Sequence, residues 1–125
     1  MAEERMTDTG QAEQVGGLSV MTTTTDGIRV LTLAGEIDHH TGDQLRHALD
    51  VTDTARPRIV IDMRQVTFMD SSGINILIAA HRAVTEACGW LRLAAPTDSV
   101  LRVLQLVGID DIIKCHPTLH EALAP

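Results

Sequence analysis

The segment of residues 59–88 constrains the possible fold more than any other part of the chain. The run Arg58–Met63 holds four apolar residues in six, the pattern of a central strand that is covered on both faces. After this strand in the sequence, apolar side chains recur at helical spacing from Ser71 or Ser72 to about Cys88. A buried strand followed so closely by a long helix predicts an α/β fold with helices on both sides of the strand.

Two shorter runs before this segment predict an antiparallel β-hairpin. Residues 18–21 and 28–33 alternate apolar and polar side chains, as half-buried strands do. Asp26-Gly27 between them is a strong turn signal.

Capping patterns mark the first and the last helix. Thr41 and Gln44 have the spacing of a capping box, and so do Thr118 and Glu121. The first helix must end before Arg56, because Pro57 disfavours helical backbone at the residue that precedes it.

The other elements follow from glycine and proline positions. Gly89 and Gly108 stand where helices usually end, and Pro96-Thr97 introduces the third helix. Residues 90–94 and 111–114 read as strands. Strands that alternate with helices imply right-handed crossovers and a partly parallel sheet. We therefore predict an α/β fold with a mixed sheet of four to five strands, opened by the antiparallel hairpin, and about four helices.

Length and composition predict one domain with an aliphatic core. The chain has 125 residues, 44% of them hydrophobic, with Phe68 and Trp90 as its only aromatic residues of the Phe, Tyr and Trp types. Residues 1–17 hold few large apolar side chains and four acids against one base, so we predict a flexible tail there and a domain over residues 18–125.

The same numbers argue against several classes of partner. The net charge of −7 and the scarcity of aromatic residues disfavour nucleic acid. We expect no membrane span, because no apolar run approaches the roughly 18 residues that one needs, and the acidic start is unlike a signal peptide. The expected location is the cytoplasm, with Cys88 and Cys115 as reduced, partly buried thiols.

Two interpretations apply to Ser71 and Ser72, which open the second helix. In the first, one serine serves only as an N-cap, which accepts a backbone N–H and contributes about 1 kcal/mol. Alternatively, the free N–H groups and the helix dipole stabilise a phosphate at this point. Gly73 either lets a partner's backbone approach or belongs to the helix turn.

Other chemistries find less support in the sequence. Asp38 and Asp70 lack the paired base or metal cluster that general acid/base catalysis would need. His39-His40 should point apart in extended chain, so we expect no metal site. His81, on the apolar helix face, is interpreted as a satisfied half-buried histidine. The surplus small and apolar side chains of this helix are either a contact patch or buried: Ile76, Ala79, Ala80 and Ala83.

Three stretches resemble the STAS domains of bacterial anti-sigma factor antagonists. They are Gly35–Thr41, the strand Ile59–Asp62 and, above all, Phe68–Gly73. The resemblance runs from about Leu18 to the C-terminus, and two motifs in the family's order are more specific than the Asp-Ser-Ser-Gly tetrapeptide alone.

The resemblance implies a partner-switching cycle in transcription regulation, such as a stress response. In that family the unphosphorylated antagonist binds an anti-sigma factor with serine kinase activity and releases a sigma factor. Phosphorylation ends the binding, and a PP2C-type phosphatase restores it. Ser71 matches the family's phosphoacceptor, and the loop of Asp38 is expected beside it, with Ser72 as cap or support. The predicted partner-binding residues are Asp38, His39, His40, Thr41, Asp70, Ser71, Ser72, Gly73, Asn75 and Ile76.

Two alternatives remain open from the sequence. A STAS sensor or scaffold module would bind a nucleotide or other small anion at the same helix N-terminus without being phosphorylated. A small hydrolase would use Ser71 as nucleophile, but the Gly-x-Ser-x-Gly elbow of such enzymes is absent around it. We therefore predict a binding protein rather than an enzyme, with no cofactor.

Overall fold

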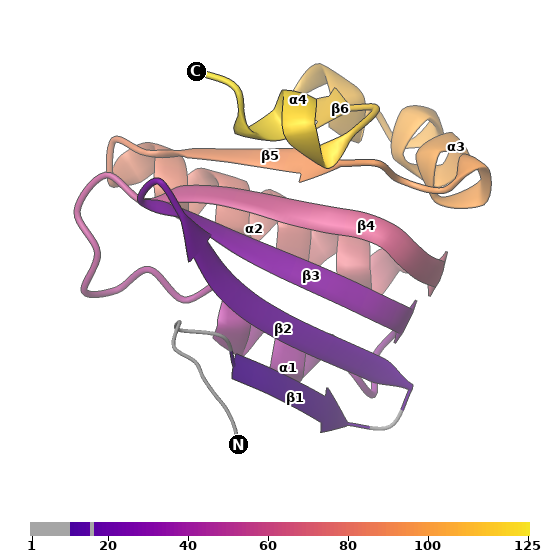
Figure 1. The fold of residues 1–125 in the computed structure, drawn as a ribbon. Coiled ribbons are helices and arrows are strands. Elements are labelled where there is room, and N and C mark those ends of the chain that lie inside the picture. The colour runs from indigo at the N-terminus through magenta and orange to yellow at the C-terminus, as the bar shows by residue number, and fades with distance from the viewer. Residues whose placement is uncertain (1–10, 16) are drawn as a thin grey trace.

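One mixed sheet organises the computed structural model, which describes residues 11–15 and 17–125 (Figure 1). In the described part the sheet has six strands in the spatial order β1-β2-β3-β4-β5-β6. The first three strands pair antiparallel, and β3 through β6 pair parallel. The strands are β1 (Gln11–Val15), β2 (Leu18–Thr25), β3 (Ile28–Ile37), β4 (Arg58–Met69), β5 (Trp90–Ala94) and β6 (Lys114–His116). The helices are α1 (Gly42–Ala48), α2 (Ser71–Glu86), α3 (Asp98–Leu106), α4 (Leu119–Leu123) and the short 3₁₀ helix η2 (Ile109–Asp111).

The predicted α/β class, the mixed sheet and the opening hairpin are confirmed, the hairpin being β2 and β3. The described part also contains the expected four α-helices. The strand β1 is additional and lies within the predicted flexible tail, so that prediction is wrong for residues 11–15. Strand pairing uses backbone groups that every non-proline residue carries, so an edge strand can form without large apolar side chains. Residues 1–10 and 16 of the predicted tail lie outside the described residues.

Helices cover both faces of β4, as its apolar pattern predicted. Ile59 and Ile61 belong to the main core cluster, which the buried side chains of α1, α2 and α3 complete. Val60 faces the other way, into a smaller cluster that includes Ala122 of α4. In Figure 1, α1 and α2 lie behind the sheet, whereas α4 crosses in front of β5.

The predicted strand at residues 111–114 is wrong in its position. Gly108 adopts the left-handed conformation (φ 80°), as expected after α3, and the chain then turns through η2 before β6 begins at Lys114. Ile109 and Ile113 are both buried, and the N–H of Ile113 donates to the carbonyl of Ile109 at 2.8 Å. Their spacing of four residues is that of a helical turn, which explains why a strand pattern failed here.

The end of α2 differs from the prediction as well. Gly89 does not take the left-handed conformation; Cys88 does, with φ 65°. A Cβ on Gly89 would lie 1.8 Å from the carbonyl oxygen of Pro57, so the close approach of two backbones is what requires glycine. Cys88 is exposed and Cys115 is half-buried; both thiols are free. Burial, and then the charge of Asp110, raise the pKa of the Cys115 thiol.

Candidate functional site

The carboxyl ends of β3 and β4 bring the two sequence motifs together. The last residues of these parallel strands, Ile37 and Met69, are partners in the sheet. Directly beyond them, the backbone N–H of Asp70 donates to the carbonyl of Ile37 at 3.1 Å. The turn that holds Asp38 therefore lies beside the loop that leads into Ser71.

Asp38 organises a tight, hydrogen-bonded turn. Its Oδ1 accepts the backbone N–H groups of His40 at 2.9 Å and Thr41 at 3.1 Å. Because the ionised carboxylate is the better acceptor, these bonds lower the pKa of Asp38; the bond from His40 has the largest effect, and partial desolvation opposes it.

Thr41 does not cap α1 through its side chain, so the predicted capping box is wrong there. Thr41 already has near-helical backbone angles (φ −100°, ψ −8°) and is buried. Its Oγ1 instead accepts the N–H of Asp38 and donates to the carbonyl of Glu36, both at 2.9 Å. The hydroxyl thus joins the turn to the end of β3. At Thr118 the predicted cap is present, since its Oγ1 accepts the N–H of Glu121 at 3.1 Å.

The two adjacent histidines do not point apart. The ring centroids of His39 and His40 lie 4.0 Å apart with the planes tilted by 39°. The prediction assumed extended chain, whereas these residues lie in a turn. Within the described residues no group of three or more His, Cys, Asp or Glu side chains could hold a metal ion.

Asp70 is the N-cap of α2. It has extended backbone angles (φ −105°, ψ −169°), and its side chain accepts the N–H of Ser72 at 2.8 Å. Its carbonyl accepts the N–H groups of Gly73 at 3.1 Å and Ile74 at 3.3 Å. The capping role predicted for Ser72 is therefore wrong, because α2 begins at Ser71, two residues earlier than that role needs. The signal was present in the sequence: an Asp directly before a helical pattern is a preferred N-cap.

Ser71 presents its hydroxyl to solvent in the first turn of α2. The side chain is exposed and makes no hydrogen bond within the described part of the chain, so no histidine activates it there as a base. Ser72 is half-buried. Farther along the helix, His81 is half-buried as predicted, but its Nδ1 is buried and has no partner among the described residues, so the histidine is not fully satisfied.

Gly73 is required by packing inside the domain. A Cβ at this position would lie 2.6 Å from Cγ of Met69 and 2.9 Å from Cγ2 of Ile37. The glycine lets α2 start close against the ends of β3 and β4, which favours the helix-turn interpretation over access for a partner. Three of the predicted partner-binding residues are buried and lie beneath the surface formed by the Asp38 turn and the start of α2: Thr41, Gly73 and Ile76. The exposed or half-buried ones form it: Asp38, His39, His40, Asp70, Ser71, Ser72 and Asn75.

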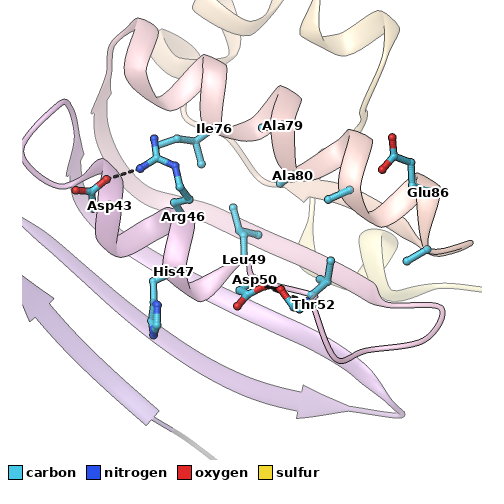
Figure 2. Close-up of a pocket in the computed structure, with 13 residues that line it drawn as sticks. Asp43, Arg46, His47, Leu49, Asp50, Thr52, Ile76, Ala79, Ala80 and Glu86 are labelled. Atoms are coloured by element: carbon cyan, nitrogen blue, oxygen red, sulfur yellow. Dashed lines mark hydrogen bonds and ion pairs between the residues drawn. The ribbon is translucent and has the colours of Figure 1, made fainter.

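A groove of about 750 Å³ runs between α1 and α2 behind this surface (Figure 2). Ile76 and Ala80 are 4% and 7% exposed, whereas Ala79 and Ala83 are exposed. Burial therefore explains Ile76 and Ala80, whereas Ala79 and Ala83 are exposed, and a contact role for these two stays a prediction.

The arrangement of these elements matches a known family. A sequence profile of the STAS domain matches residues 19–122. The chain belongs to the STAS domain family. No helix in the described part of this STAS domain is long and apolar enough to cross a membrane.

Several relatives of this STAS domain are anti-sigma factor antagonists. The anti-sigma-F factor antagonist RsfB of Mycobacterium tuberculosis is 32% identical over 99 residues, which cover 78% of this chain and 80% of that protein. The crystal structure of an anti-sigma factor antagonist from Mycobacterium paratuberculosis superposes with a TM-score of 0.76 at 30% identity, covering 85% of this chain and 91% of that one. SpoIIAA of Bacillus in its phosphorylated form superposes with a TM-score of 0.61 at 26% identity, covering 91% and 96%.

Proposed function

We propose that this STAS domain is an anti-sigma factor antagonist that is switched off by phosphorylation of Ser71. In its unphosphorylated form it binds an anti-sigma factor with serine kinase activity, which releases a sigma factor. The observation that carries the proposal is the exposed, unbonded hydroxyl of Ser71 beside the Asp38 turn. The relatives named anti-sigma factor antagonists support the general role, and SpoIIAA, which has been solved in a phosphorylated form, supports the switch.

The electrostatics of the site explain how a phosphoryl group would act. It adds a charge of about −1.5 to −2 and several acceptor oxygens. The carboxylate and carbonyl of Asp70 already accept the N–H groups of Ser72, Gly73 and Ile74. The new dianion would therefore remain hydrated beside the carboxylates of Asp70 and Asp38, and a docked partner would have to remove that water. Phosphorylation should thus weaken partner binding and leave the fold intact.

The same hydrogen bonds disfavour the alternative of an anion sensor at this helix end. A nucleotide phosphate would need the first-turn N–H groups that Asp70 already engages, and it would meet the carboxylate of Asp70. We retain the antagonist as the proposed function, with a PP2C-type phosphatase as the enzyme that resets it in the cytoplasm.

The test begins with the partner. A pull-down from the host lysate with wild-type protein, followed by mass spectrometry, identifies a kinase of the anti-sigma type. That kinase, ATP and the purified protein are then combined, and the intact mass and the complex are measured. Wild type should gain one phosphoryl group and leave the complex, whereas Ser71→Ala should stay bound and unmodified and Ser71→Asp should bind weakly.

Ser99 offers a matched control. It is also an exposed serine in the first turn of a helix, α3. Ser99→Ala should behave as wild type in both measurements. Phosphorylation of Ser71→Ala, or equal binding by Ser71→Ala and Ser71→Asp, would refute the proposal.

A further inference from the structure

A second polar site lies at the opposite end of the central strands from Ser71. It is a cleft of about 290 Å³ between the β2–β3 turn and the loop that leads into β4. β4 starts at Arg58 beside the cleft and ends just before Asp70, and its twelve residues span about 35 Å. Figure 1 shows the turn and the loop at the same end of the sheet. Three arginines line the cleft: Arg29, Arg56 and Arg58.

None of these arginines forms an ion pair within the described residues, where the pairs found are Arg46 with Asp43 and Arg64 with Asp62. Hydrogen bonds from Thr52 lower the pKa of Asp50, and the charge of Arg29 adds a smaller effect in the same direction. The Asp50 carboxylate accepts the hydrogen bonds of Thr52 and none from Arg29. Three guanidinium charges thus meet in one small cleft of a chain whose net charge is −7, without a carboxylate bonded to any of them.

Two of the three guanidinium groups are held in place by neutral acceptors. Nη1 of Arg29 donates to the carbonyls of Ala48 at 3.3 Å and Asp50 at 3.1 Å. Nη2 of Arg58 donates to the carbonyl of Asp26 at 3.1 Å. These bonds fix the direction of both groups and do not themselves neutralise their charge, so an anion would meet donors that are already ordered.

Many donors in the cleft remain available. A guanidinium carries five N–H groups, of which Arg58 uses one for a bond within the described chain, and the exposed Arg56 uses none. The hydroxyl groups of Thr24 and Thr54 also line the cleft. The backbone of Arg56 has φ 53°, which glycine adopts without strain. An arginine at this position therefore has a less favourable backbone energy than a glycine would have.

We propose that this arginine cleft binds the phosphate group of a small ligand. Guanidinium groups match phosphate oxygens in bidentate geometry, and a phosphate offers more acceptor sites and more charge than a single carboxylate. The inference does not rest on the proposed function, because Ser71 and the cleft lie at opposite ends of β4. Binding here would leave the Asp38 and Ser71 surface free.

The experiment is a titration of the full chain with pyrophosphate at constant ionic strength, followed by NMR of the arginine side-chain N–H groups. We expect saturable shifts at Arg29, Arg56 and Arg58 with a Kd of about 1 mM or tighter. Arg56→Gln should weaken binding about tenfold or more without loss of fold, since its side chain makes no hydrogen bond in the described part of the chain. Arg58→Gln should do the same, with the melting temperature as the check on folding.

Arg102→Gln is the matched control, because it removes one exposed positive charge from α3, away from the cleft. It should bind pyrophosphate as wild type does. Equal weakening by Arg102→Gln and Arg56→Gln would reduce the effect to general charge attraction and overturn the proposal, as would shifts that do not saturate. If the protein pellets with phosphatidylglycerol vesicles and pyrophosphate reverses the pelleting, the phosphate belongs to a lipid headgroup. If pyrophosphate binds saturably and the protein does not pellet with the vesicles, the phosphate belongs to a soluble ligand.

Discussion

Replacing Asp70 tests whether this residue, rather than a serine, holds the first turn of α2. Asp70→Ala removes the acceptor for the N–H of Ser72, a bond of 2.8 Å. The loss of a helix cap costs about 1 kcal/mol, and the loss of a negative charge at the helix N-terminus adds about 0.5 kcal/mol. The free energy of unfolding should therefore fall by about 1.5 kcal/mol, roughly a tenfold change in the unfolding equilibrium.

Asp70→Asn separates the two contributions. Asparagine keeps a side-chain oxygen that can accept the same N–H but carries no charge, so it should cost only about 0.5 kcal/mol. Urea unfolding followed through the fluorescence of Trp90, the single tryptophan, gives both values. With a typical slope for a chain of this size, Asp70→Ala should lower the urea midpoint by about 1 M.

The cap of α3 provides the control. Thr97 accepts the N–H of Val100 over a longer distance, 3.4 Å, so Thr97→Ala should cost less than Asp70→Ala, about 0.5 kcal/mol. If Asp70→Ala unfolds at the wild-type urea midpoint, or if Asp70→Asn is as unstable as Asp70→Ala, the assignment of Asp70 as the cap is wrong.

Three further perturbations follow from particular contacts. Gly89→Ala would place a Cβ 1.8 Å from the carbonyl oxygen of Pro57, so we expect a loss of about 3 kcal/mol in urea unfolding; a loss below about 1 kcal/mol would contradict the required close approach. The pKa of Asp38 lies below 3.8, chiefly because the backbone N–H two residues on donates to the carboxylate. Its contribution to stability is complete above pH 3.8 and disappears as the pH falls through the lower folded-state pKa; a carboxyl ¹³C titration with a midpoint at or above 3.8 would disprove this. Arg92 donates two hydrogen bonds to carbonyls at the end of α4 and lies 3.8 Å over the ring of Trp90. Arg92→Met should cost about 1 to 2 kcal/mol and speed amide exchange in α4, and unchanged exchange would refute its role as an anchor.

Local patterns were enough to predict most of the elements. The apolar run of β4, the turn at Asp26-Gly27 and the helical spacing after Ser71 depend on neighbours in sequence, and the structure contains all three elements. The predictions that failed did so for two kinds of reason, local hydrogen bonding that the patterns did not show and contacts between distant parts of the chain. β1 pairs with the strand that directly follows it, Val15 opposite Leu18, and Asp70 caps its own helix. The glycine at position 89, in contrast, is needed because Pro57, 32 residues earlier, passes against it.

The candidate site divides in the same way. An Asp, two serines and a glycine at the start of a helix can be recognised from sequence, because capping and dipole effects are local. The role of each residue depends on where the first helical turn begins. Asp70 caps the helix, Ser71 faces solvent, and Gly73 contacts the core. A shift of one residue in the start of a helix reassigns all of these roles.

The sequence by itself determined the order and kind of elements, the aliphatic core and the motif that carries Ser71, since periodicity, turn residues and capping chemistry act over a few residues. Only the tertiary structure decided which side chains meet. Parallel pairing of β3 with β4 places Asp38 beside Asp70. At the opposite end of the same two strands, Arg29, Arg56 and Arg58 line one cleft. The physical reason is that such encounters depend on strand register and chain crossings, which involve residues tens of positions apart and leave no local pattern.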